Sequence, residues 1–163
     1  MKQIVTPALL TALIFTGAIF GFFYAWVCST MWGLDTMNPK DAIRAMNAMN
    51  ASVRNGVFFA SFMGTPLVLG LAAIVSWGSG ARDLARLLGL ALVVYMLGAF
   101  IPTRLVNVEM NMALAEGGVP ATQHSAQAIW AAYSAKWQLF NQIRTVASGL
   151  CLMLVGWALL RHR

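Results

Sequence analysis

The sequence predicts an all-α integral membrane protein, in which four transmembrane helices form a bundle and an amphipathic helix occupies the first extramembrane loop. Of the 163 residues, 60% are hydrophobic and 10% are charged, whereas soluble domains average about 45–50% and about 25%. Four strongly apolar stretches of 16 to 32 residues carry no charged side chain, and a spanning helix needs about 20 residues. A helical apolar stripe follows the first stretch. These features exclude an ordinary soluble enzyme, a disordered chain and a coiled coil.

The charge-free stretches place the predicted spans. They cover residues 3–34, 55–81, 87–103 and 145–160. The first is longer than a span needs, so we expect part of it to tilt or to project from the membrane. The last two are short, because 16 residues rise about 24 Å against a hydrocarbon core of about 30 Å. We predict one membrane domain over residues 1–163, with spans at about 7–31, 56–77, 84–103 and 141–160.

Positive charge is distributed as in a membrane protein. The net charge of +6 is scattered over both predicted sides of the membrane, so we expect no nucleic-acid partner. On the side that holds both termini, Lys and Arg are packed into short segments at helix ends, which favours the cytoplasm. We therefore predict a protein of the bacterial inner membrane with both termini cytoplasmic. The long loops at about 35–54 and 104–140 then lie outside.

The first long loop has the pattern of a helix. Asn38 is a typical N-cap, and Pro39 is favoured at the first helical position. Apolar side chains then recur at spacings of three and four, namely Ile43, Met46, Met49 and Val53. The opposite side carries Asn47, Asn50 and Arg54. We predict a helix that lies on the membrane surface or covers the mouth of the bundle.

Two polar stripes adjoin the outer membrane boundary. One consists of Arg104, Asn107 and Asn111, at helical spacing in a third helix that we expect to continue beyond Pro102. The other consists of Trp130, Tyr133, Trp137, Asn141 and Arg144. The aromatic residues alone are typical of an interfacial belt. The amides need polar partners near membrane depth, so we expect the stripes to face each other across a small-molecule pocket, with Glu109 pairing with Arg54 or Arg144.

Motifs for metal or nucleotide chemistry are missing from the sequence. It holds no CxxC, HExxH, GxGxxG, P-loop or GxSxG motif. The two histidines, His124 and His162, fall on opposite predicted sides of the membrane and cannot ligate one haem. We interpret Met46 and Met49 as packing residues rather than copper ligands. We therefore predict no metal site and no cofactor.

Four short motifs follow one another in a characteristic order. They are Gly21-Phe22-Phe23, Ala45-Met46-Asn47 with Asn50, Asn107-Val108 with Asn111, and Trp137 with Asn141 and Arg144. Taken together, they resemble the anthrone-oxygenase-like family of small membrane proteins. The resemblance implies a four-helix membrane protein. It also implies similarity to oxygenases that convert an anthrone to an anthraquinone without a metal or flavin. Glu109 stands where family members commonly carry proline, so we do not expect it to be a shared catalytic base.

The chemistry of such a reaction assigns roles to the two stripes. An anthrone has an acidic C–H bond, and its enolate passes an electron directly to oxygen. The site needs a slot for flat rings, donors for an oxyanion, and a base. We predict catalytic roles for Asn107, Asn141 and Arg144. We predict substrate-binding roles for Trp130, Tyr133, Trp137, Asn111, Arg104 and Asn50. The base is Tyr133, His124 or water.

A non-enzymatic role is the main alternative. In a lipid- or quinone-binding module, or in an accessory subunit, the same amides would be structural and the arginines would hold lipid phosphates. Transport ranks last, because four spans are few and no inverted repeat is evident. In each case the expected partners are the membrane and a hydrophobic small molecule or lipid, and the oligomeric state is left open.

Overall fold

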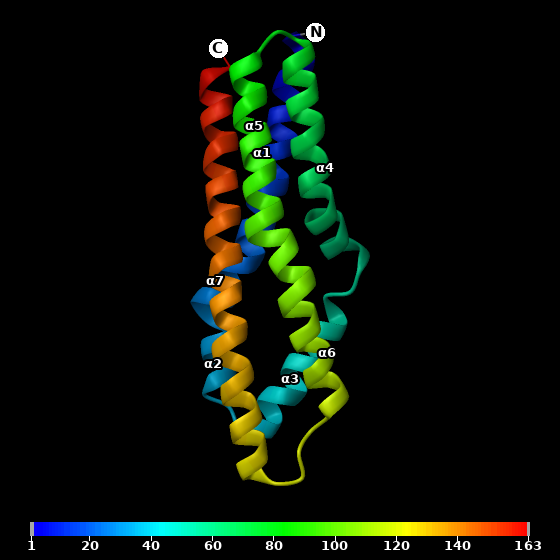
Figure 1. The fold of residues 1–163 in the computed structure, drawn as a ribbon, viewed down its shortest axis with the longest axis vertical. Helices are drawn as coiled ribbons and strands as arrows, with labels where there is room; N and C mark the ends of the chain where they lie inside the picture. The colour runs from blue at the N-terminus through cyan, green and yellow to red at the C-terminus, as the bar shows by residue number, and fades with distance from the viewer. Residues whose placement is uncertain (1, 163) are drawn as a thin grey trace.

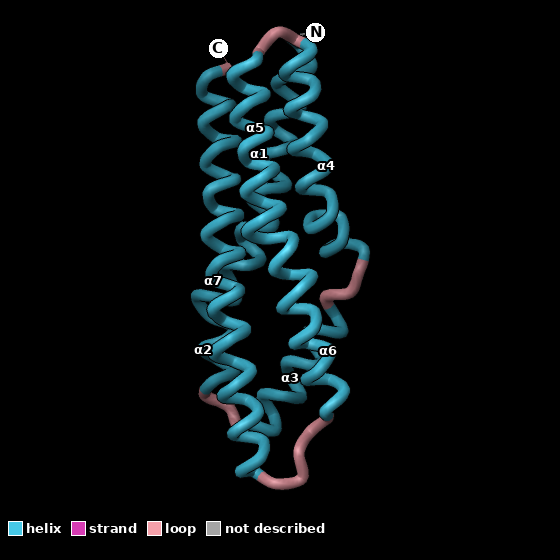
Figure 2. Tube along the Cα trace, in the orientation of Figure 1, coloured by secondary structure: helices cyan, strands magenta, loops and turns pink. Residues whose placement is uncertain are grey.

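The predicted all-α membrane fold is confirmed by a computed structural model, which describes residues 2–162. Within that range the chain is helical apart from short loops, and no strand occurs (Figure 2). Four helices of the described chain are long and apolar enough to cross a membrane. They pack side by side as a bundle, with both termini at the same end (Figure 1).

The first membrane helix is longer than its predicted span. It consists of α1 (Lys2–Ala25), a π-helical segment η1 (Trp26–Thr30) and α2 (Met31–Asp35). The last part, α2, contacts α3 and α7 at the end of the molecule away from the termini (Figure 1). The first helix therefore continues past residue 31, the end of its predicted span.

The first loop holds the predicted amphipathic helix, α3 (Pro39–Ser52). The side chain of Asn38 accepts a hydrogen bond from the backbone N–H of Lys40 at 3.1 Å, as an N-cap does. Ile43 and Met46 are completely buried. The expectation that Asn50 lies on the opposite, polar side is wrong, because its side chain is buried against α6.

The remaining three membrane helices differ strongly in length. The shortest is α4 (Gly56–Gly78). The next runs from Arg82 to Gly117 and comprises α5 (Arg82–Tyr95), η2 (Met96–Phe100), η3 (Thr103–Asn107) and α6 (Val108–Gly117). The last is α7 (Gln123–Arg161), whose 39 residues extend about 58 Å, roughly twice the hydrocarbon thickness. Together with α2 and α3, α6 and the first half of α7 form the end of the molecule away from the termini, which we expect to lie outside the hydrocarbon and call the extramembrane part.

The third helix passes through Pro102 without ending, as predicted. Two π-helical segments, η2 and η3, flank this proline. Proline removes one backbone N–H from the helical hydrogen-bond ladder, and π-helical turns occur as single-turn bulges within α-helices. The consequence is a local change of register just where the helix leaves the membrane portion of the bundle.

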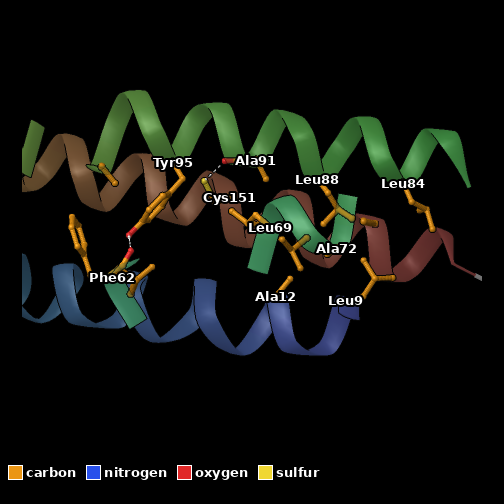
Figure 3. Packing of buried hydrophobic residues seen from close by; sticks show 14 of the residues in the cluster. Leu9, Ala12, Phe62, Leu69, Ala72, Leu84, Leu88, Ala91, Tyr95 and Cys151 are labelled. Atoms are coloured by element: carbon orange, nitrogen blue, oxygen red, sulfur yellow. Dashed lines mark hydrogen bonds between the residues drawn. The ribbon is translucent and has the colours of Figure 1, made fainter. Parts of the chain in front are cut away.

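Two separate cores hold these parts together. The bundle core contains residues such as Leu9, Leu69 and Leu88 (Figure 3). There the hydroxyl of Tyr95 donates to the carbonyl of Phe62 at 2.8 Å, so the polar end of this buried ring is paired. The extramembrane core is built from α2, α3, α6 and α7, and its buried members are Met31, Leu34, Ala42, Ile43, Met46, Leu114, Ala126, Trp130, Tyr133 and Trp137.

Apolar side chains also cover the outside of the bundle. Ile14, Leu67 and Met153 are each more than 60% exposed. A water-soluble surface rarely carries such a continuous apolar cover, whereas a surface in contact with lipid requires one. The outer surface therefore agrees with an integral membrane protein.

Close packing of η2 against α7 requires a small residue at position 98. A Cβ atom added to Gly98 would lie 2.4 Å from Cβ of Ala147, whereas one added to Gly89 would meet no atom within 4 Å. We expect Gly98→Ala to lower the free energy of unfolding by about 1–3 kcal/mol, because the two helices must move apart. Gly89→Ala is the matched control, with stability unchanged or slightly raised. SDS unfolding titrations followed by circular dichroism measure both, and equal stability of the two variants would contradict this packing.

Candidate functional site

A cavity of about 320 Å³ lies between the two cores. This volume is at the lower end of the range for small-molecule sites, and the wall is mainly apolar with a few polar groups, as in such sites. The lining residues come from every membrane helix and from α3. They are Phe22, Trp26, Asn50, Val53, Arg54, Phe58, Phe59, Phe62, Met63, Thr103, Arg104, Asn107, Val108, Asn111, Met112, Trp137 and Arg144.

Two of the π-helical segments contribute to this wall. The segment η1 supplies Trp26, and η3 supplies Thr103, Arg104 and Asn107. The ring of Trp26 meets that of Trp137 with centroids 5.0 Å apart, so the two indoles form one aromatic corner of the cavity. π-helical turns occur frequently at functional sites. Their position here is a second indication that the cavity is the site.

The central charged group of the cavity wall is Arg144, whose side chain is 4% exposed. Its Nη2 donates to Oδ1 of Asn141 at 2.9 Å, and its Nη1 donates to Oγ1 of Thr103 at 3.3 Å. The guanidinium carbon also lies 4.7 Å from the ring centre of Phe23 and 5.1 Å from that of Trp137. Asn141 is in turn held by a hydrogen bond from its Nδ2 to the carbonyl of Phe23 at 3.0 Å.

No carboxylate neutralises Arg144 in the described part of the chain. The two ion pairs found among residues 2–162 are Arg44–Asp41 and Arg86–Asp83, and both are exposed. The cavity lining contains no Asp or Glu. Burying a cation without a counter-charge is unfavourable by several kcal/mol, of which cation–π contacts recover a part. The wall is therefore electrostatically complementary to an anion.

A chain of amide hydrogen bonds leads from α7 to α3. Nε1 of Trp137 and the hydroxyl of Tyr133 both donate to Oδ1 of Asn111, at 3.0 and 2.7 Å. Nδ2 of Asn111 then donates to Oδ1 of Asn50 at 2.9 Å. Because an indole N–H can only donate, it determines the orientation of the Asn111 amide and, through it, that of Asn50. Asn50 is left with its Nδ2 donor available.

Unpaired polar atoms concentrate on the residues that line the cavity. Five buried side-chain N or O atoms in the described chain have no hydrogen-bond partner, and three of them are Asn50 Nδ2, Asn107 Oδ1 and Arg144 Nε. Each such atom costs about 1–3 kcal/mol when it stays unpaired. Two donors and one acceptor on the wall of one cavity are what a bound polar molecule would satisfy.

Some residues of the aromatic and polar stripe on α7 line the cavity, and others form hydrogen bonds to the lining residues or lie outside the wall. Trp137 and Arg144 line the cavity. Tyr133 and Asn141 do not line it, and they bond instead to the lining residues Asn111 and Arg144. Trp130 lies outside the cavity wall, and its Nε1 donates to Oδ1 of Asp35 at 3.0 Å. All five side chains are buried, so the aromatic members do not form an interfacial belt facing lipid.

The other stripe lines the cavity with all three of its members. Asn107 is buried, Asn111 is half-buried and Arg104 is exposed at the rim. The expectation that Glu109 pairs with Arg54 or Arg144 is wrong, because Glu109 is exposed and forms no ion pair within residues 2–162. Its place on the helix, off the polar stripe, turns it away from both arginines.

Sequence reasoning missed two features of the site. The carboxylate of Asp35 accepts hydrogen bonds from Trp130, Ser134 and Gln138, and so attaches α2 to α7. Its signal was that Asp35 is the first acidic residue after the first apolar stretch. The aromatic wall contributed by α4 was also missed; it includes Phe58 and Phe62, stacked at 5.3 Å. A uniformly apolar span gives no sequence signal for which side faces a cavity.

The comparison with known families agrees with this arrangement. A family profile described as Anthrone oxygenase matches residues 56–154, which is more than half of the chain. The chain belongs to the anthrone oxygenase family. The matched region includes most of the cavity wall, with Asn107, Asn111 and Arg144. No curated protein and no solved structure shows significant similarity.

The amide chain allows a stability test on this anthrone oxygenase family member. Asn111→Leu removes the acceptor for Tyr133 and Trp137 and the donor to Asn50, so we expect the free energy of unfolding to fall by about 3 kcal/mol. Asn47→Leu on α3 is the control, because Asn47 Oδ1 is buried without a partner and the substitution breaks no bond made by that atom. SDS titrations compare the two variants. A similar, small effect in both would show that the amide chain contributes little.

Proposed function

We propose that this membrane protein is an oxygenase that converts a hydrophobic, anthrone-like aromatic substrate to a quinone without a cofactor. The observation that carries the proposal is Arg144, a buried cation without a carboxylate partner in the described chain, at the wall of an aromatic cavity. Membership of the anthrone oxygenase family supports the same reaction class. The site needs to bind a flat ring system and to stabilise a negative oxygen on it.

The reaction balances as anthrone plus O₂ giving anthraquinone plus water. Loss of a proton from the central CH₂ group places negative charge on the carbonyl oxygen across the ring. This anion transfers one electron to O₂, and the resulting radical and superoxide combine at the same carbon to give a peroxide. Cleavage of the O–O bond, with loss of the remaining hydrogen on that carbon, releases water and leaves the second carbonyl.

The cavity offers a group for each requirement. Trp26 and Trp137 provide flat apolar surfaces for the rings. Arg144 Nε and Asn50 Nδ2 are donors placed to stabilise the oxyanion, since preorganised donors in a dry site act most strongly on developing charge. Asn141 and Thr103 act as positioning residues, because they hold the guanidinium group of Arg144.

Asn107 has a different role in this scheme from the donor expected from sequence. Its Nδ2 donates to the carbonyl of Trp137 at 3.5 Å, and its unpaired atom is Oδ1. We therefore assign Asn107 as an acceptor for an O–H group, on either the substrate or the peroxide. Trp130 and Tyr133 support the wall and do not contact substrate in this proposal.

Water is the proton acceptor that we propose from the three candidates. Tyr133 donates its hydroxyl hydrogen to Asn111, and His124 is exposed at the start of α7. The cavity lining, as far as the structure describes it, contains no Asp, Glu, His or Lys. A site with three arginines, Arg54, Arg104 and Arg144, favours the deprotonated substrate, so water suffices as the base.

The proposed orientation keeps both termini in the cytoplasm of a bacterial inner membrane. The cavity would then lie at the outer boundary of that membrane. A lipid- or quinone-binding role is the second candidate. It is favoured by Arg54 and Arg104, which are exposed at the rim of the cavity, where they would suit lipid phosphates.

Oxygen uptake by the purified protein with anthrone tests the proposal. Arg144→Lys keeps the charge but loses the planar fork, so we expect kcat to fall about 10²–10³-fold, as on loss of an oxyanion donor. Asn141→Ala should also lower kcat, because Arg144 loses the acceptor for its Nη2. Arg86→Lys is the matched control; this exposed residue pairs with Asp83 at the opposite end of the bundle and should leave uptake unchanged.

Two outcomes would contradict this function. One is equal uptake by Arg144→Lys and by the unchanged protein. The other is uptake by folded protein no greater than that of a boiled sample, since anthrones also oxidise spontaneously. The second outcome would favour the lipid- or quinone-binding role, and extraction of the purified protein would then identify the bound molecule.

A further inference from the structure

The length of α4 determines where the cavity lies relative to the membrane. Its 23 residues carry no charge and extend about 34 Å, close to the hydrocarbon thickness. The two ends of α4 therefore mark the two membrane boundaries. Phe59 and Met63, in its first two turns, lie just inside the hydrocarbon, whereas Arg54, just before the helix, lies among the headgroups.

The third membrane helix provides an independent estimate of the depth of the cavity in the membrane. It begins at Arg82, directly after the short loop that follows α4. About 20 residues are needed to recross the hydrocarbon, which brings the chain to the neighbourhood of Arg104. Arg104 thus lies at the level of the same headgroups as Arg54. Arg144, on α7, is buried in the cavity wall, whereas Arg54 and Arg104 are exposed.

The exposed lining residues show where the cavity opens. Phe59, Met63 and Met112 line the cavity and are 45%, 40% and 41% exposed, and Arg54 and Arg104 are exposed as well. A residue that both lines a cavity and is exposed belongs to its mouth. The mouth therefore has an apolar side at the depth of the acyl chains, formed by Phe59 and Met63, and a cationic side at the depth of the headgroups.

We propose that the cavity opens sideways into the bilayer and takes its ligand from the adjacent leaflet. This inference rests on the proposed function, because it concerns the route to the same site. The ligand class is a flat, apolar ring compound with one acidic oxygen. Such a molecule dissolves in the membrane with its rings among the acyl chains and its oxygen near the headgroups. The rings enter past Phe59 and Met63, which lie one turn apart on the same face of α4, and the oxygen passes Arg54 and Arg104 to reach Arg144.

A route from water would use the other side of the mouth. Met112 lies about two turns beyond Arg104 on the extramembrane helix α6, so it marks that side. Beyond it, the extramembrane core of α2, α3, α6 and α7 is packed with buried side chains such as Met46 and Leu114. The two routes therefore pass different methionines, and they can be narrowed separately.

Binding kinetics in phosphatidylcholine vesicles test the entrance. The probe is 1,8-dihydroxyanthraquinone, which is already oxidised and is not turned over; its fluorescence is followed after rapid mixing, with protein-free vesicles as the baseline. We expect Met63→Trp to slow association and dissociation together by about tenfold, with Kd nearly unchanged, because a narrowed entrance acts on both rates. Leu67→Trp, one turn further along α4, 67% exposed and outside the cavity lining, is the control and should change neither rate.

Met112→Trp separates the two routes. Unchanged rates in Met112→Trp with slow rates in Met63→Trp support entry from the bilayer. Entry from the bilayer is overturned if Met112→Trp slows the rates and Met63→Trp does not, or if neither substitution changes them. A weaker Kd in Met63→Trp with unchanged association also overturns it, because Met63 would then be part of the binding wall. Absence of probe binding by the unchanged protein would overturn the proposed function itself and this entrance with it.

Discussion

A guanidinium group buried at the edge of a membrane must be stabilised by its neighbours, and much of this structure is organised around that of Arg144. Three helices contribute. From α1 come the ring of Phe23 and the carbonyl that holds Asn141, from η3 comes Thr103, and from α7 come Asn141 and Trp137. These contacts satisfy part of the guanidinium group and leave its charge without a carboxylate in the described chain. The fold thus maintains a positive centre that an anionic molecule can neutralise.

The orientation of the polar groups in the cavity wall is also fixed by the structure. In a low-dielectric interior, an amide that can rotate offers a donor and an acceptor equally and selects no ligand. Here the indole N–H of Trp137, which can only donate, fixes the orientation of the Asn111 amide, and Asn111 in turn fixes the orientation of the Asn50 amide. Three elements that are distant in sequence, α3, α6 and α7, are tied together by the same bonds. The same bonds therefore connect the helices and fix which amide atoms face the cavity.

Local patterns in the sequence account for the fold but for only part of the candidate site. Charge-free length and helical periodicity are local properties, and they predicted the four apolar helices, the helix α3 and the two polar stripes. Which members of a stripe reach a cavity depends on helix tilt and on the register change at η1 and η3, which no short pattern encodes. The expectation for Asn50 followed its polarity, although its spacing of seven from Ile43 and four from Met46 puts it on their buried face of α3. Asp35 was missed because its hydrogen-bond partners on α7 are distant in sequence. The roles assigned to the stripe residues remain predictions.

The unequal helix lengths have a consequence for how the protein responds to its lipids. The short helix α4 and the long helix α7 belong to the same packed bundle. A change in the tilt or depth of α4 in the membrane therefore also moves α7. A thicker bilayer would be accommodated by local thinning of the lipid around α4, and a thinner bilayer by tilt of the helices. Either response changes the depth of Arg104 and Arg144 relative to the phosphates. Hydrophobic mismatch, set by acyl-chain length, is thus a physical control on the polar end of the cavity.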